Sequence, residues 1–339
     1  MITTVEQLED YLAKPSAALI EDVKRIQGDI IILGIGGKMG PTLAYLLKNA
    51  IDAANTNQRV IGVSRFSSGT LQQELETKGI ETIACDLLND EALAALPYAP
   101  NVIYMAGNKF GTQGNEHFTW AMNSYLPGRV AEHYKGANIV VFSTGNVYPF
   151  TPVKDGGCDE SCLPNPIGEY GQSSLGRERV FTYFAHRDQT PMSIFRLNYA
   201  IDIRYGVLVE IARAVYEGRP IDITMGHVNV IWQGSANEYA IRSLLHTAVP
   251  PTIFNATGPE TLSVRWLANE FGKLFKREPI LVGEESEDAL LSNSSKAHRT
   301  FGYPSVSIRE LIELVSNWIE HDGVYLNKPT HFQERAGQY

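Results

Sequence analysis

The stretch IIILGIGGKMG, residues 30–40, decides how the chain folds. Its four leading apolar residues predict a short strand buried on both faces, and the pattern over residues 38–53 predicts a helix directly after it. Glycine permits a tight turn that brings the N–H groups of a helix start against phosphates. We therefore predict a diphosphate-binding turn, with a glycine turn that holds no ligand as the alternative. Its residues are Gly34, Gly36, Gly37, Lys38, Met39 and Gly40, with Lys38 either adding positive charge at the phosphates or lying in solvent.

Apolar runs alternate with amphipathic segments beyond this turn. Strands are predicted at 60–63, 81–85, 101–105, 138–142 and 192–197, and helices at 71–78, 118–134 and 170–186. This alternation predicts an α/β fold with a Rossmann-type, doubly wound parallel sheet. We assign an N-terminal helical extension to residues 1–27 and the dinucleotide-binding domain to 28–200. A smaller C-terminal α/β substrate lobe, partly interleaved with the main domain, takes 201–326, and a loose polar tail takes 327–339.

Composition and charge exclude several classes of protein. The 339 residues carry 29 basic and 38 acidic side chains, a net charge of −9, which argues against a nucleic-acid binder. The apolar runs are too short to cross a bilayer, and the acidic, amphipathic start is unlike a secretory signal. We expect a cytoplasmic protein that binds neither nucleic acid nor membrane.

Cysteine and histidine usage gives no sign of a disulfide framework or a metal site. Three cysteines are too few for such a framework, and the eight histidines show no HxxxH or HExxH pairing. Cys158 and Cys162 fall in a stretch rich in Pro, Gly and Asp, residues 149–166, which predicts a long loop. We expect both thiols to be solvated there.

The second predicted strand ends in Ser64 and Arg65. An acidic residue at this point would hydrogen-bond the adenosine ribose of NAD, and none is present. Ser64 and Arg65 would instead hold a 2′-phosphate, which favours NADP slightly over NAD. The alternative is an ordinary surface arginine.

From about residue 29 to about residue 320, an ordered series of motifs resembles the extended short-chain dehydrogenase/reductases, the NAD-dependent epimerase/dehydratase group. The glycine turn has that family's GxxGxxG spacing, FSTGNVY at 142–148 resembles its SSxxVY, and YGQSS at 170–174 resembles its YGxSK. The resemblance implies a nicotinamide cofactor, NAD or NADP, and a sugar, sugar acid or nucleotide sugar held by the C-terminal lobe. It also implies a homodimer, formed through the helices at 118–134 and 170–186.

The resemblance assigns roles to particular residues. Tyr170 exchanges a proton with the substrate, Thr144 hydrogen-bonds the same oxygen, and Ser174 binds the nicotinamide ribose. A hydroxyl beside the reacting oxygen stabilises developing charge, and a phenol acts as general acid or, when ionised, as general base. The further cofactor contacts implied are Asp86, Leu87, Ala106, Gly107, Lys109, Asn123, Ser143 and Asn198.

One departure bears on the chemistry: the family's YxxxK motif needs a lysine where this chain has Ser174. In the family, that lysine binds the ribose and lowers the pKa of the tyrosine. An unassisted phenol has a pKa near ~10, so only about one in a thousand is ionised at pH 7. Oxidation would suffer more from this than reduction.

Three explanations of the missing lysine stay open. Another cation replaces it, either Lys109 from its loop or Arg177 from the same helical face. Alternatively, the enzyme works mainly as a reductase, or in a step that needs no ionised tyrosine. In the third, hydride chemistry is lost and the chain is a dinucleotide-binding sensor or scaffold. For Arg177 itself, we expect a surface ion pair with a neighbouring glutamate.

Overall fold

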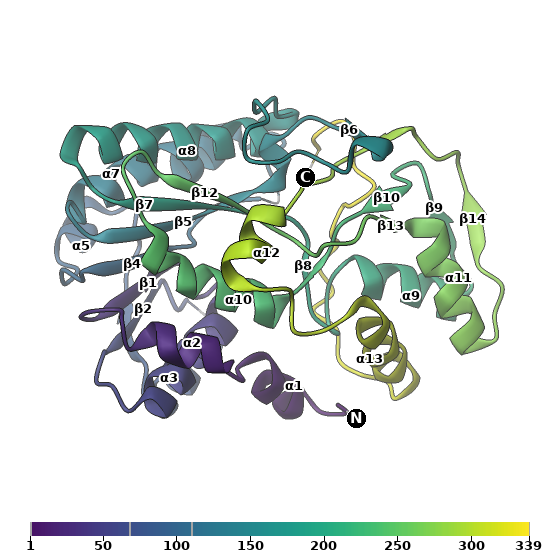
Figure 1. The fold of residues 1–339 in the computed structure, drawn as a ribbon, viewed down its shortest axis with the longest axis horizontal. Coiled ribbons are helices and arrows are strands. Elements are labelled where there is room, and N and C mark those ends of the chain that lie inside the picture. Colours follow the sequence, from purple (N-terminus) through teal and green to yellow (C-terminus); the bar gives the residue numbers. More distant parts are fainter. Residues whose placement is uncertain (1, 68, 110, 339) are drawn as a thin grey trace.

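The computed structural model describes residues 2–67, 69–109 and 111–338 and centres on one parallel sheet (Figure 1). Its strands lie in the order β3-β2-β1-β4-β5-β7-β12, and every neighbouring pair is parallel. Their bounds are β1 Ile30–Leu33, β2 Val60–Ser64, β3 Glu81–Ala84, β4 Asn101–Tyr104, β5 Asn138–Thr144, β7 Met192–Leu197 and β12 Thr252–Ala256. The predicted Rossmann-type α/β fold is confirmed.

Helices cover both faces of this sheet, which explains why its strands are apolar on both sides. Ile30 and Ile32 of β1 belong to the core shared with α2, α3 and α10, whereas Ile31 and Leu33 belong to the core shared with α5, α7 and α8. These helices are α2 Ala17–Val23, α3 Gly40–Ala54, α5 Asp90–Ala94, α7 Leu126–His133, α8 Gly168–Asp188 and α10 Gln233–Arg242. All four β1 side chains are fully buried.

The lobe has its own core, built from α9 Val207–Glu217, α11 Val264–Phe275 and α13 Ile308–Glu320. Two segments of the predicted lobe nevertheless belong to the main domain. Strand β12 forms the edge of the seven-stranded sheet beside β7, and α10 packs against α3. The lobe and the main domain are therefore interleaved in sequence.

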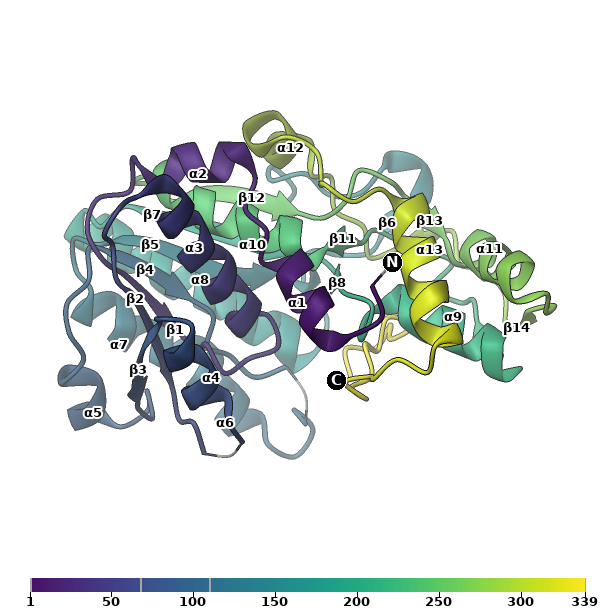
Figure 2. The same ribbon diagram turned by 90° about the horizontal axis from the view of Figure 1, so that it is seen from below.

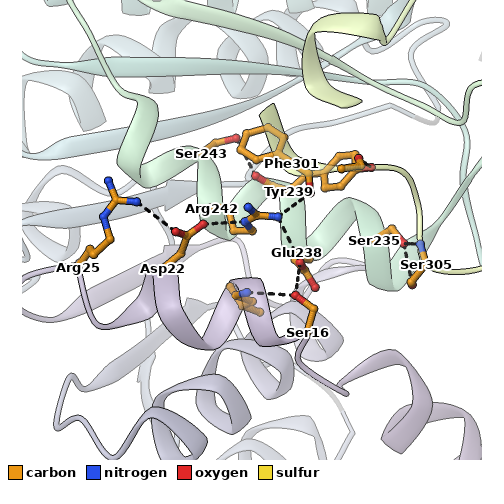
Figure 3. Close-up of polar contacts among 12 residues, drawn as sticks. Ser16, Asp22, Arg25, Ser235, Glu238, Tyr239, Arg242, Ser243, Phe301 and Ser305 are labelled. Carbon is orange, nitrogen blue, oxygen red and sulfur yellow. Dashed lines mark hydrogen bonds and ion pairs between the residues drawn. The ribbon is translucent and has the colours of Figure 1, made fainter. Parts of the chain in front are cut away.

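The N-terminal extension bridges these two parts. Helix α1 (Val5–Leu12) packs in the lobe core and lies beside α13 in Figure 2, where the Tyr11 hydroxyl donates to Glu310 at 2.9 Å. Helix α2 is held against α10 by a partly buried ion pair between Asp22 and Arg242 at 2.7 Å (Figure 3). Arg242 also donates to the Phe301 carbonyl at 2.7 Å, at the end of α12 (Ser295–Phe301). This cluster fixes the extension to the body.

The C-terminal segment differs from the predicted loose tail, because it packs against the body. Phe332 is buried in the lobe core, and Thr330 donates to both carboxylate oxygens of Glu210 on α9. Near the chain end, the Gly337 backbone lies against that of Gly168. Polar composition predicted looseness, but these specific contacts outweigh it.

The predicted helix at 118–134 is divided into α6 Glu116–Trp120, a π-helical turn Ala121–Tyr125 and α7. The remaining elements are short: α4 Leu71–Thr77, β6 Thr151–Pro152, β8 Ala200–Ile201, β9 Pro220–Asp222, β10 His227–Val228, β11 Ile231–Trp232, β13 Leu262–Ser263, β14 Ile280–Val282, β15 Asp288–Ala289 and 3₁₀ turns at 145–147, 153–155 and 243–246. Within the described residues, no helix has the length and apolarity needed to span a membrane.

Candidate active site

Two adjoining cavities lie at the carboxyl ends of the parallel strands, where such sheets bind ligands. The Tyr170 cavity, of about 470 Å³, lies between the sheet and the lobe and is lined by Lys38, Lys109, Thr144, Tyr170, Asn198, Tyr205, Lys328 and Thr330, among others. The glycine crevice, of about 280 Å³, is lined by Gly36, Ser64, Arg65, Asp86, Leu87 and Ala106, among others. Both touch Gly34, Gly37, Met105, Gly107 and Asn108, so they form one continuous groove.

The glycine crevice fits the diphosphate of a dinucleotide. Gly34 has a φ of +91°, and a Cβ there would lie 2.7 Å from the Ala106 nitrogen. At Gly36, a Cβ would lie 2.4 Å from the Ser64 Oγ and would narrow the crevice. Helix α3 begins at Gly40 with no side-chain cap from Met39, so the positive end of its dipole faces an anion unshielded, while the Gly40 N–H itself donates to the Gly37 carbonyl at 3.2 Å and Pro41 has no N–H.

The two predicted residues Tyr170 and Thr144 come from the first turn of α8 and the end of β5. Both line the Tyr170 cavity. The Thr144 hydroxyl donates to Asn146 Oδ1 at 3.0 Å and accepts from the Asn146 N–H at 3.1 Å. These local bonds fix the hydroxyl at the cavity wall.

A cation does lie beside Tyr170. The Lys109 Nζ is 5.7 Å from the centre of the Tyr170 ring, and both side chains line the same cavity. Burial lowers the pKa of Lys109 to about 8, which the nearby Glu210 partly offsets. The amine therefore keeps a positive charge at neutral pH, within reach of the phenol.

On α8, the helix that carries Tyr170, the surroundings of Arg177 differ from the prediction. Arg177 does not form a surface ion pair: it is 6 % exposed and donates to the Phe142 carbonyl at 2.8 Å and to Asn123 Oδ1 at 2.6 Å. Its place on the sheet-facing side of α8 causes this burial. Ser174 is fully buried, its Oγ has no hydrogen-bond partner among the described residues, and it lines neither cavity. A contact between Ser174 and the ribose stays a prediction.

The side chains of Asn123 and Ser143 are hydrogen-bonded to other groups of the protein. Asn123 lies in the π-helical turn, and its amide bonds the Asn108 backbone at both N–H and C=O, 2.8 Å each. The Ser143 hydroxyl lies at the cavity but donates to Glu178 at 2.5 Å. Glu178 in turn holds the buried guanidinium of Arg196 through two bonds, of 2.6 and 2.9 Å. As a direct cofactor ligand, Asn123 would have to give up one of its bonds, whereas the Ser143 hydroxyl could still accept a hydrogen bond while it donates to Glu178.

Lys38 was predicted at the phosphates or in solvent, and the structure places its partly buried side chain at the Tyr170 cavity. Its Nζ donates to the Ala200 carbonyl at 3.0 Å and lies 3.6 Å from the centre of the Tyr205 ring. The side chain therefore extends from the glycine turn into the Tyr170 cavity. Burial lowers the pKa of this amine to about 7.

Other cavity residues were missed or judged differently from the sequence. Tyr205, Lys328 and Thr330 line the cavity from the lobe and the C-terminal segment. No local motif marks them, because they reach the site through the tertiary fold. Asn198 was predicted and does line the cavity, with its buried Nδ2 lacking a hydrogen-bond partner among the described residues. The next residue, Tyr199, has a φ of +44°, an uncommon conformation for a residue with a side chain.

The loop cysteines do not match the prediction that both are solvated. Cys158 is 1 % exposed, packs with Val147 and Tyr148, and hydrogen-bonds Leu291 and Asn293 through its backbone. Burial raises the pKa of its thiol to about 12. Across residues 2–67, 69–109 and 111–338, no group of three His, Cys, Asp or Glu side chains has the arrangement of a metal site.

Known proteins share this architecture at low sequence identity. No protein-family model matches the chain, and no curated protein sequence does. Among solved structures, MoeE5 in complex with UDP-glucose and NAD has a TM-score of 0.64 and 20 % identity, over 87 % of this chain and 99 % of that one.

Two further solved structures have a similar fold. The UDP-glucuronic acid 4-epimerase of Bacillus cereus in complex with NAD has a TM-score of 0.69 and 18 % identity, over 86 % of this chain and 96 % of that one. The UDP-glucose 4-epimerase of Thermus thermophilus in complex with NAD has a TM-score of 0.68 and 17 % identity, over 86 % and 99 %. The chain thus has the fold of the extended short-chain dehydrogenase/reductases that the sequence motifs resemble.

Proposed function

We propose that the protein is a nicotinamide-dependent epimerase or oxidoreductase that acts on a nucleotide sugar or related carbohydrate. The observation that carries this proposal is one continuous groove: a glycine turn built for a diphosphate opens into the cavity lined by Tyr170 and Thr144. The structures with the same fold were solved with NAD, and MoeE5 also with UDP-glucose.

The glycine crevice would hold the cofactor's diphosphate against the backbone of the glycine turn and the positive end of the α3 dipole. A bound nicotinamide would accept or return a hydride. Tyr170 would exchange a proton with the substrate oxygen, and Thr144 would hold that oxygen in place. Lys109 would supply the positive charge that the missing lysine supplies elsewhere, from the loop after β4 rather than from α8.

A finer proposal concerns the choice between the two nicotinamide cofactors. Arg65 is exposed and lines the glycine crevice together with Ser64. A guanidinium binds a phosphate monoester well, which favours NADP at this position. Asp86 lines the same crevice and would remain available to the adenine end.

We also propose a homodimer formed through α7 and α8. Tyr125 and Tyr183, each 59 % exposed, lie at the outer side of this helical layer. Large exposed aromatic side chains are enriched at protein interfaces.

The enzyme proposal is tested by cofactor binding and turnover. The protein should bind NADH or NADPH in a fluorescence titration and change nicotinamide absorbance with a panel of UDP-sugars and their 4-keto forms. Tyr170→Phe should cut turnover about 1,000-fold with little change in cofactor affinity. The matched control is Tyr98→Phe, at a tyrosine that is 58 % exposed and lines neither cavity, and it should keep full turnover.

Three outcomes separate the possible functions. Loss of turnover in Tyr170→Phe alone supports the enzyme. Tight cofactor binding with no turnover of any sugar, unchanged in Tyr170→Phe, supports the sensor or scaffold instead. Absence of cofactor binding contradicts both.

A further inference from the structure

The Tyr170 cavity collects positive charge in a protein whose net charge is −9. Lys38 and Lys109 line it from two different loops of the main domain, and Lys328 lines it from the C-terminal segment. Arg204, which does not line the cavity, is a third positive group acting on the Lys38 amine, beside Lys109 and Lys328. A neutral sugar would bring no anion of its own to this set of cations, and only the diphosphate of a linked nucleotide would.

The two nearby carboxylates are already bound to other groups. Asp202, the acid that acts on Lys38, pairs with Arg204 at 3.1 Å and accepts the Arg204 backbone N–H at 2.6 Å. Glu210, the acid that acts on Lys109, accepts the Thr330 hydroxyl at 2.8 Å. Arg204 is thus paired with Asp202 and also with Glu9 at 3.6 Å. Among the described residues, the positive excess at this cavity comes from its three lining lysines, set against Glu210.

The direction of the Lys38 side chain argues against a role at the cofactor diphosphate. Its amine points to the Ala200 carbonyl and the Tyr205 ring, both on the lobe side of the Tyr170 cavity. Lys38 does not line the glycine crevice. Burial of a cation beside other cations is unfavourable, and an anion in the cavity would relieve that cost. The lowered pKa of Lys38 agrees with an amine awaiting such a partner.

We infer that the Tyr170 cavity takes a sugar that carries a carboxylate, free or as its nucleotide-linked form, and that Lys38 is the residue that selects this charge. The inference rests on the proposed function for the reaction itself and adds the class of substrate. Lys109, beside Tyr170, would serve the reacting end of the sugar, while Lys38 would bind its acidic group. A lysine ammonium has three donors, which suits a carboxylate held against the Ala200 carbonyl side of the cavity.

The test compares two ligands that differ only in the acidic group. Calorimetric titrations of the cofactor-saturated protein with UDP-glucuronic acid and with UDP-glucose share the same nucleotide and diphosphate. We expect UDP-glucuronic acid to bind at least about tenfold more tightly, as one charge-assisted contact would give. Lys38→Met should bring the ratio of the two affinities close to one, while Lys38→Arg should keep a preference for the acid. The control is Lys273→Met, which removes an exposed amine on α11 and should leave the ratio unchanged.

The other outcomes overturn the inference in distinct ways. Equal affinities of the unmodified protein for the two ligands mean that the cavity does not recognise the carboxylate. Equal weakening of both ligands in Lys38→Met assigns the lysine to the diphosphate. Binding of glucose 6-phosphate in preference to glucose, without any preference for UDP-glucuronic acid, assigns the cations to a phosphate ester. Cofactor affinity, measured first in a separate titration, shows whether the proposed function itself has failed.

Discussion

The two sides of Tyr170 are built differently. On the side of its own helix, where the resembled motif has a lysine, Ser174 is buried without a partner among the described residues and Arg177 is bound to Phe142 and Asn123. On the side of the loop after β4, Lys109 lies 5.7 Å from the ring. The positive charge expected from the helix is therefore available from the loop, and the helix cation holds the fold together instead.

This difference gives the two cations near Tyr170 separate tasks. The loop cation is the candidate for assisting Tyr170, and Arg177 stabilises the junction between α8, β5 and the π-helical turn. Each side then gives its own prediction, because removing Lys109 should change chemistry and removing Arg177 should change stability.

The largest expected effect comes from Lys109→Met. Loss of one preorganised charge at a reacting centre should lower the rate of alcohol oxidation about 100-fold at pH 7, measured by nicotinamide absorbance. Since the pKa of Lys109 is lowered to about 8, its charge is present below pH 8 and lost above it. The difference in oxidation rate between the variant and the unmodified protein should therefore become smaller as the pH rises from 7 to 9.

Two controls accompany this experiment. Ser174→Lys, added to Lys109→Met, returns a cation from the helix side and should restore part of the rate. Lys135→Met removes an exposed amine at the far end of α7 and should leave the rate unchanged. An unchanged rate in Lys109→Met would mean that the loop cation does not assist Tyr170.

A smaller effect is expected for Arg177→Met, measured by urea unfolding. The change removes the buried side-chain donor to the Phe142 carbonyl and one of the two donors to Asn123 Oδ1, which should cost about 2 kcal/mol in the free energy of unfolding. Arg179→Met, at an exposed position two residues along the same helix, should stay within about 0.5 kcal/mol of the unmodified protein. Equal free energies of unfolding in the two variants would mean that the Arg177 hydrogen bonds do not stabilise the fold.

The smallest effect concerns Arg65, at the opposite end of the groove. Arg65→Ala should weaken NADPH binding about tenfold and leave NADH binding nearly unchanged, because only NADPH carries the 2′-phosphate. Fluorescence titrations with NADPH and with NADH give the ratio of the two affinities. Equal weakening of the two would remove the preference for NADP.

Sequence reasoning predicted the fold well because the sheet is a local pattern. Buried strands such as Ile30–Leu33 and a glycine turn at a helix start are read from adjacent residues. The same holds for Thr144, which ends a strand, and Tyr170, which lies in the first turn of a helix. The structure brings both to one cavity.

The parts that sequence reasoning missed depend on distant contacts. Nothing near Lys38 predicts that its amine turns toward Ala200, 162 residues away. The burial of Arg177 depends on a residue in the π-helical turn, and that of Cys158 on the packing of residues 291–293. Polar side chains that find partners far along the chain resemble surface residues until the fold is known.

The ion pair between Asp22 and Arg242 joins two helices that are synthesised at very different times. Its partners are 220 residues apart, so α2 leaves the ribosome long before the helix that it packs against. Strand β12 is also late, and the edge of the sheet beside β7 stays unpaired until it emerges. Truncation before residue 256 would therefore leave an exposed strand edge and an undocked amphipathic helix, both of which favour aggregation. Expression of the main domain alone, cut at residue 200, should yield an insoluble product.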